Sequence, residues 1–159
     1  MVNVRRGTAA DRDAAERVWR LSVTARDSRE PSADVSRVVH DVLHAPDTRL
    51  VVAEQDGRIV AMACTRPGRN ELGQADPRLC HLQMIFVLPE HSGVGIGGRL
   101  LDFVLDEART SDFDRIQLWV IEGNAPATRL YTRRGFRHTG RIVEEGGALI
   151  GLWSRPLDD

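Results

Sequence analysis

Residues 86–101 read FVLPEHSGVGIGGRLL, a glycine cluster between two apolar segments. The segment before the glycines, residues 79–88, predicts a strand that ends at Pro89. The segment after them repeats leucine and valine at helical spacing, which predicts a helix. Glycine lets the backbone approach an anion closely, and a helix N-terminus adds partial positive charge. The cluster is therefore a candidate phosphate or diphosphate site, with an ordinary flexible turn as the alternative.

The same glycines raise a competing interpretation, because Gly93, Gly95 and Gly98 satisfy the GxGxxG pattern of dinucleotide-binding folds. In that pattern the first glycine follows the strand directly, whereas here residues 89–92 intervene. Roughly 80 residues precede the cluster and only about 60 follow it, too few for the remaining βα units of a doubly wound sheet. The spacing and the position in the chain both disfavour this fold.

The rest of the chain predicts further strands and helices on both sides of the cluster. Strands are expected at residues 2–5, 50–54, 58–65, 116–121, 137–143 and 148–155, and helices after Thr8, at 35–43 and after Asn124. Asp56 and Gly57 predict a tight hairpin turn, and residues 66–77 predict an irregular connection. Leu21, on the first helix, and Val35 and Val38, on the second, belong to the predicted apolar stripes. The expected order is β, two α, three β, α, β, α and two β.

Length and composition indicate one globular domain, residues 1–159, with no second domain or repeat. A formal net charge of −1 disfavours a broad binding surface for nucleic acid or anionic lipid. No stretch approaches the roughly 20 apolar residues of a membrane-spanning helix and no leader is evident, so we expect a cytoplasmic protein. Cys64 and Cys80 lie in apolar runs without CxxC spacing, which favours buried thiols over a metal site.

Two segments resemble the sequence signatures of the GNAT family of N-acetyltransferases. The first is the acetyl-CoA signature Q/R-x-x-G-x-G/A, which falls on Ser92, Gly95 and Gly97, with serine where the family has Arg or Gln. The second is the pattern N-x-x-A-x-x-L-Y-x-x-x-G-F, which is matched by Asn124, Ala127, Leu130, Tyr131, Gly135 and Phe136. The resemblance is specific from residue 79 to residue 136 and extends along the chain in element order.

The resemblance implies an α/β fold, α+β in some schemes: a mixed, mostly antiparallel sheet of about seven strands with four helices. In this family the central parallel strands, here residues 79–88 and 116–121, splay apart and admit the pantetheine arm of acetyl-CoA. The cofactor's diphosphate is expected on the loop residues Gly93, Val94, Gly95, Gly97 and Gly98. The main chain near Val87 is expected to bind the pantetheine amides, and Asn124 to add a polar contact. Asn124 has a second interpretation as a simple helix cap.

The implied reaction transfers an acetyl group to a primary amine of a small molecule, peptide or protein, by direct attack in a ternary complex without a metal. Tyr131 is the candidate acid, because its hydroxyl can donate a proton to the departing thiolate. The alternative is an aromatic residue that only packs against Leu130 and Phe136. Tyr131 is also expected among the residues that contact the cofactor.

A base must remove a proton from the amine, directly or through water. His81 lies on the predicted strand eleven residues before Ser92, where some branches of the family carry a catalytic Glu or His. Imidazole is partly neutral at physiological pH, so His81 is the candidate base, with Glu122 and an ordered water as rivals.

The acceptor and the assembly stay open at this point. Acidic residues that could attract a cationic amine stand in the two segments that contact substrate in this family: Asp27, Glu30, Asp34, Glu144 and Glu145. Exposed carboxylates are also ordinary solvated surface, so this signal is weak. The alternative function is a noncatalytic acyl-CoA-binding or regulatory module, and we expect a monomer or a homodimer.

Overall fold

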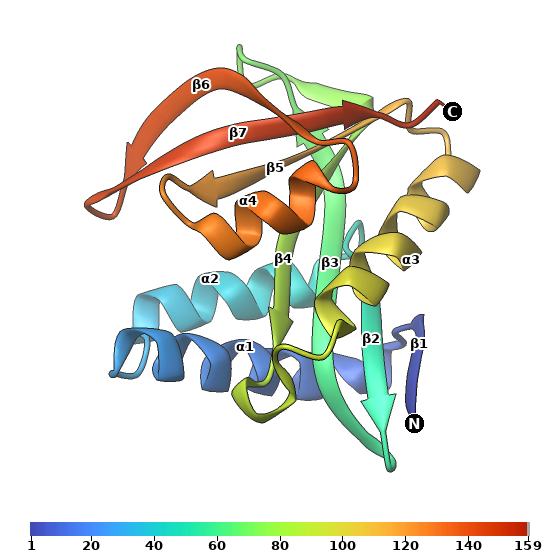
Figure 1. Ribbon diagram of the computed structural model, residues 1–159, viewed down its shortest axis with the longest axis vertical. Coiled ribbons are helices and arrows are strands. Elements are labelled where there is room, and N and C mark those ends of the chain that lie inside the picture. The colour runs from blue at the N-terminus through green and yellow to red at the C-terminus, as the bar shows by residue number, and fades with distance from the viewer. Residues whose placement is uncertain (159) are drawn as a thin grey trace. The chain divides into compact units, whose positions relative to one another are not determined.

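The computed structural model describes residues 1–158, and it contains the predicted elements in the predicted order (Figure 1). The strands are β1 (Val2–Arg6), β2 (Arg49–Gln55), β3 (Arg58–Arg69), β4 (Ala75–Val87), β5 (Arg115–Ile121), β6 (Arg137–Glu145) and β7 (Ala148–Pro156). The α-helices are α1 (Arg12–Asp27), α2 (Ala33–His44), α3 (Ile96–Thr110) and α4 (Ala125–Thr132), with short 3-10 helices η1 (Ala9–Asp11) and η2 (Pro89–His91). The strands form one seven-stranded sheet in the order β1-β2-β3-β4-β5-β7-β6. This confirms the predicted fold class.

The chain divides into two compact units, and β3, β4 and α3 each continue from one unit into the other. The first unit contains residues 1–66 and 84–106, and the second contains 67–83 and 107 to the end of the described residues. The single domain expected from the sequence stays a prediction.

In the first unit, β1, β2 and β3 form an antiparallel ladder whose centre is apolar. Asp56 and Gly57 turn the β2–β3 hairpin with φ of 53° and 76°, as the Asp-Gly pair predicted. Arg5 of β1 donates to Asp11 at 2.8 Å and to Glu54 at 3.1 Å, which ties β1 to η1 and β2. The helices α1 and α2 lie side by side (Figure 1).

In the second unit, β5, β6 and β7 form antiparallel ladders, and β4 pairs with β5 in parallel. The parallel ladder joins Leu79, Cys80 and His81 to Arg115, Ile116 and Gln117. It covers only the first part of β5, which continues to Ile121 and pairs with β7 along its whole length. A short parallel ladder is what two strands that diverge would form.

Two sequence predictions about detail are wrong in part. The irregular connection expected at 66–77 is shorter, because β3 continues to Arg69 and β4 begins at Ala75. The predicted apolar stripes match the buried faces only in part: Val18 and Leu43 are buried as predicted, whereas Leu21 is 40% exposed, and Val35 and Val38 are 49% and 62% exposed. The side chains that α1 buries are Ala15, Val18, Trp19 and Val23, whereas α2 buries Leu43.

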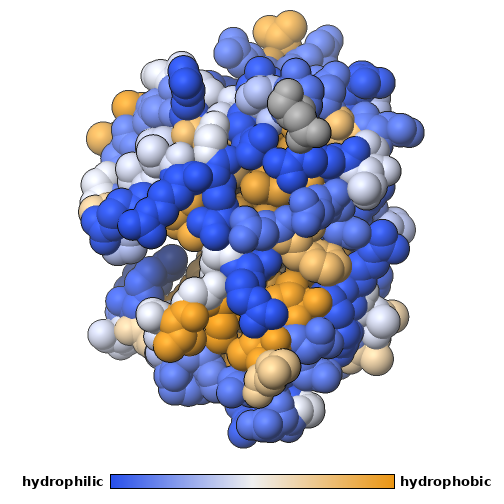
Figure 2. All heavy atoms as spheres, turned by 45° about the vertical axis from the view of Figure 1, so that its right-hand side comes forward, coloured by the Kyte–Doolittle hydropathy of each residue, from blue (hydrophilic) through white to orange (hydrophobic). Residues whose placement is uncertain are grey.

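The two cysteines lie in the core. Cys64 and Cys80 are buried and unbridged, as predicted. Burial raises the pKa of the Cys64 thiol to about 12. On the face drawn in Figure 2, hydrophilic side chains predominate and apolar ones form small groups between them. None of the helices in the described part of the chain is long and apolar enough to cross a membrane.

Candidate functional site

The glycine cluster forms a loop that leads from β4 through η2 into α3. Its first residue, Ser92, donates from its backbone N–H to Pro89 O at 3.2 Å and from its hydroxyl to Leu88 O at 3.3 Å. Both bonds close the η2 turn, so the Ser92 side chain is engaged with the loop's own backbone. Ser92 therefore positions the loop.

Two glycines give the loop a conformation that other residues rarely adopt. Gly93 and Gly95 have φ of 79° and 89°, in the region that L side chains disfavour. The first intrahelical bond of α3 runs from Arg99 N–H to Gly95 O at 3.2 Å. The N–H groups of residues 96–98 precede that bond and belong to the helix end that has no intrahelical acceptor. They form the type of backbone cradle that binds a phosphate at a helix N-terminus.

The end of β4 is held by α1. Ser22 of α1 donates from its hydroxyl to Val87 O at 3.3 Å, and Leu88 N–H donates to Val60 O of β3 at 2.9 Å. A carbonyl oxygen has two lone pairs, so Val87 O can accept a second hydrogen bond. Ser22 fixes the main chain at the position predicted to bind pantetheine. Nothing in the sequence identified Ser22, because a lone serine on a helix carries no motif.

In the second unit, Tyr131 lies on α4 and is buried, with 6% of its surface exposed. Its ring makes an edge-to-face contact with Phe136, with centroids 5.6 Å apart. Burial raises the pKa of the Tyr131 hydroxyl to about 12, because the phenolate would lose its hydration. The hydroxyl therefore keeps its proton at physiological pH and can act as a donor. The packing and the proton-donor interpretations are compatible in this geometry.

Asn124 is the N-cap of α4. Its Oδ1 accepts from Ala127 N–H at 3.2 Å, as the helix-cap interpretation predicted, and Pro126 stands in the first turn. The cap is confirmed. The amide nitrogen of Asn124 is a separate donor group, so capping does not consume the polar contact expected for the cofactor.

The candidate base His81 lies half-buried on β4, opposite Gln117 of β5 in the parallel ladder. Gln117 Nε2 lies 3.3 Å from His81 Nδ1. An amide nitrogen only donates, so Nδ1 is the acceptor, and the proton of a neutral His81 ring is on Nε2. Gln117 was not identified from the sequence. Its role is to hold the ring in one tautomer.

The rival base Glu122 follows β5 and belongs to a polar cluster that the sequence did not reveal. Gly140 N–H donates to His138 Nδ1 at 2.8 Å, so the other ring nitrogen, Nε2, carries the proton of a neutral ring and donates to Glu122 Oε1 at 3.2 Å. Trp153 packs edge-on against the His138 ring, with centroids 5.4 Å apart. Trp153 Nε1 is buried and, among the residues that the structure describes, has no hydrogen-bond partner. Only the fold brings these residues of three strand regions together.

The acidic residues proposed for the acceptor are exposed at the surface. Asp27 pairs with Arg26 at 2.9 Å, and Asp34 lies 3.7 Å from Arg37. In the first unit, a hollow of about 430 Å³ at the α1–α2 turn is lined by Trp19, Val23, Arg26, Asp27, Arg29, Glu30, Pro31, Ser32 and Val35. It combines apolar side chains with charges of both signs.

Three comparisons relate the chain to known proteins. The Acetyltransferase (GNAT) family matches residues 13–136. A mycothiol acetyltransferase of Acidothermus cellulolyticus is 32% identical over 128 residues, which are 74% of this chain and 39% of that protein. The peptidyl-lysine N-acetyltransferase YjaB of Salmonella typhimurium is 28% identical over 144 residues, which are 89% of this chain and 87% of that protein.

Solved structures show the same fold. The Salmonella typhimurium protein yncA, solved with its cofactor acetyl-CoA, has a TM-score of 0.77 at 20% identity and covers 100% of this chain and 95% of its own. The chain spans about two fifths of the mycothiol acetyltransferase that it matches, so that protein's activity does not transfer directly.

Proposed function

Because the chain belongs to the GNAT family of acetyltransferases, we propose that it transfers an acetyl group from acetyl-CoA to a primary amine. The observation that carries this proposal is the loop of residues 92–98. Its positive-φ glycines lead directly into the first turn of α3, whose N–H groups suit a diphosphate. The presence of acetyl-CoA in the yncA structure supports the same cofactor here.

The proposed binding residues follow from the motifs and their local geometry. The N–H groups around Gly93, Val94, Gly95, Gly97 and Gly98 hold the diphosphate. Ser92 adds no charge and instead closes the turn before them. The main chain of Val87, fixed by Ser22, receives the pantetheine amides, and the Asn124 amide adds a contact.

The proposed reaction is a direct attack. The amine nitrogen bonds to the thioester carbonyl carbon, the carbon–sulfur bond breaks, and the thiolate takes a proton from the Tyr131 hydroxyl. The amine loses one proton to the base, and this proton restores Tyr131 through solvent. His81 is the proposed base. To accept the proton, its Nδ1 must give up the hydrogen bond from Gln117 and accept one from the amine or from a water. Glu122, held by His138, is the rival.

An acetyl-transfer assay tests this proposal. The chain is incubated with acetyl-CoA and each amine of a panel, and the coenzyme A released is measured with a thiol reagent. The two buried cysteines react little with this reagent and add little background. Turnover that falls about a hundredfold in Tyr131→Phe and in His81→Ala, with acetyl-CoA affinity retained, would support the assigned roles. A loss of turnover in Glu122→Gln but not in His81→Ala would identify Glu122 as the base. Binding of acetyl-CoA without turnover on any amine would indicate a noncatalytic module.

The setting of this reaction is also a proposal. An amine acceptor is the expected partner. The hollow at the α1–α2 turn has Arg26 and Arg29 beside Asp27 and Glu30, so its charge does not select a cationic amine. Unbridged Cys64 and Cys80 fit a reducing compartment such as the cytoplasm. A monomer or a homodimer is expected, which light scattering would distinguish.

A further inference from the structure

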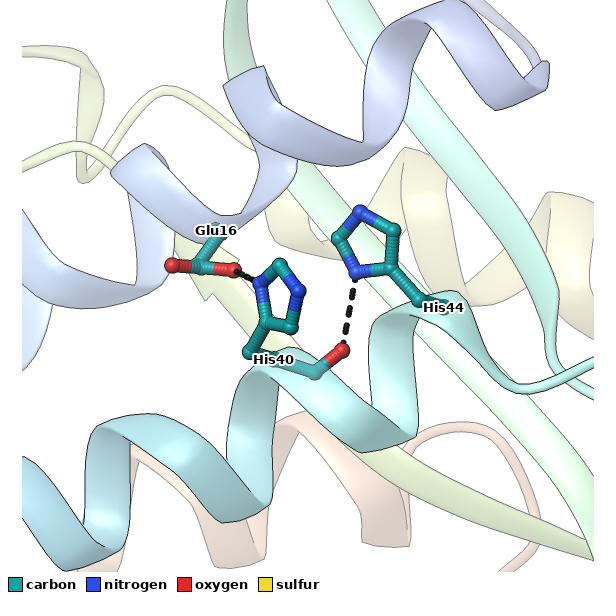
Figure 3. Close-up of side chains that lie close together, drawn as sticks. All are labelled: Glu16, His40 and His44. Carbon is teal, nitrogen blue, oxygen red and sulfur yellow. Dashed lines mark hydrogen bonds and ion pairs between the residues drawn. The ribbon is translucent and has the colours of Figure 1, made fainter.

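Two histidines and a glutamate meet on the outer side of the α1–α2 pair, in the first unit (Figure 3). His40 and His44 are one turn apart on α2, and Glu16 reaches them from α1. Each residue offers one ligand atom, and these atoms all lie within 4.8 Å of one another. The sequence predicted no metal, because 24 positions separate Glu16 from His40 and only the helix packing brings them together.

The tautomer of His44 favours metal binding. His44 Nδ1 lies 2.8 Å from the backbone oxygen of His40, which only accepts, so Nδ1 carries the proton. The lone pair is therefore on Nε2, which lies 3.6 Å from Asp13 Oδ1. Histidines that bind metals usually donate their other ring N–H to a carbonyl or carboxylate in this way. Asp13 itself is 93% exposed and lies outside the group whose ligand atoms are within 4.8 Å of one another.

Glu16 is also oriented. One carboxylate oxygen lies 2.7 Å from His40 Nδ1, and the other accepts from Arg20 of the same helix at 3.1 Å. A shared proton accounts for the 2.7 Å distance in the absence of a metal. Two ligands of a tetrahedral zinc lie about 3.3 Å apart, given bonds of about 2.0 Å. An ion can thus replace that proton if the two side chains move apart by less than about 1 Å.

The site is open to an ion from solvent. The side chains of His40 and His44 are 50% and 33% exposed, whereas Glu16 is 18% exposed and fixed beneath them. We propose that Glu16, His40 and His44 bind one divalent transition-metal ion such as Zn²⁺, Ni²⁺ or Co²⁺. Imidazole ligands select this class of ion over Mg²⁺ and Ca²⁺, which prefer oxygen ligands. The bound ion would join α1 to α2.

Isothermal titration of metal into the chain, without a polyhistidine tag and after treatment with a chelator, tests this site. One equivalent of Zn²⁺ is expected to bind, Mg²⁺ is expected to give no heat, and Co²⁺ is expected to develop a visible absorption band. His40→Gln, His44→Gln and Glu16→Gln should each weaken binding at least about tenfold. His91→Gln, a histidine outside the cluster, is the matched control and should bind as the wild type does.

Thermal unfolding provides an independent measurement. Zn²⁺ at a hundred times its Kd should raise the Tm of the wild type and of His91→Gln by about 5 °C or more, and leave that of His40→Gln nearly unchanged. The replaced side chains are partly exposed, and circular dichroism checks that each variant folds. The proposal is overturned if the wild type binds no Zn²⁺, or if the three cluster variants bind it as tightly as the wild type. Neither result depends on the acetyl-transfer activity.

Discussion

Replacement of Gly95 by alanine isolates the backbone conformation of the loop from its packing. Gly95 has φ of 89°, and a Cβ atom built there meets no atom within 4 Å. The substitution therefore introduces strain without a steric clash. Holding an L residue at such a φ costs about 1–2 kcal/mol. The unfolded chain loses entropy worth about 0.4–1 kcal/mol in the opposite direction, so a loop that keeps its conformation lowers the free energy of unfolding by about 1 kcal/mol. A loop that relaxes avoids this loss and pays the strain when it binds coenzyme A.

Gly57→Ala is the matched control. Gly57 turns the β2–β3 hairpin with φ of 76°, and its added Cβ also meets no atom within 4 Å. The same loss of about 1 kcal/mol is expected in urea unfolding. The two glycines have the same type of strain and differ only in location. Any difference in coenzyme A binding between the two variants therefore comes from the position of Gly95 in the loop.

The loop variant should differ from the control in its affinity for coenzyme A. Alanine at position 95 favours relaxed loop conformations, and binding must restore the strained one. A cost of 1–2 kcal/mol corresponds to an increase in Kd of about 5–30-fold, measured by calorimetry. Gly57→Ala should bind within about twofold of the wild type. If Gly95→Ala keeps the stability of the wild type, so that its loop has relaxed, and still binds coenzyme A equally well, the positive φ is not what presents the N–H groups.

Three further predictions concern ionisation and packing. The pKa of Tyr131 is raised to about 12 in the folded chain, so the tyrosine ionises in the unfolded chain first as pH rises above 10. The free energy of unfolding measured in urea should therefore fall by about 1 kcal/mol between pH 9 and pH 11. Tyr131→Phe should not show this decrease. The hydrogen bond from Arg5 lowers the pKa of Asp11 to about 2. The Asp11 carboxylate therefore contributes about 2 kcal/mol to the free energy of unfolding above pH 4, and this contribution is lost as pH falls towards 2. Asp11→Asn should remove that dependence, while Asn at the exposed Asp34 should leave it intact. Gly151→Ala would bring a Cβ to 2.5 Å from His138 Nε2 and 2.9 Å from Glu122 Oε2. Both atoms end partly exposed side chains that can move, so the free energy of unfolding in urea should fall by only about 1 kcal/mol, and the double variant with His138→Ala should recover part of it.

The elements that were predicted correctly depend on local chemistry. The Asp-Gly turn, the Asn124 cap and the glycine loop each place a special residue where the backbone requires it. The helix faces were predicted less well, since spacing gives a stripe but not the surface that covers it. Leu21 and Val35 follow helical spacing and are nevertheless exposed, whereas Trp19 is buried. Burial is decided by tertiary packing, which periodicity alone does not describe.

The side-chain pairs of the candidate sites were not predictable for the same reason. His81 was identified through a motif offset, but its partner Gln117 lies 36 residues away, on the neighbouring strand. Glu122 was identified, while His138, which donates to it, was not. The contact of the Ser22 hydroxyl and the cluster of Glu16, His40 and His44 depend on helix packing, and neither has a recognisable sequence pattern.

The difference between what the backbone and what a side chain contributes to the loop explains how the chain can lack the Arg or Gln of the acetyl-CoA signature. A charged side chain at position 92 would add a contact to phosphate, but it would not shape the loop. Ser92 instead donates to Leu88 O, and the glycines after it set the path into α3. The proposed diphosphate site therefore relies on backbone N–H groups, which every replacement except proline leaves in place. Ser92→Ala should then weaken coenzyme A binding only by loosening the turn, and Ser92→Arg should strengthen it with a steeper salt dependence.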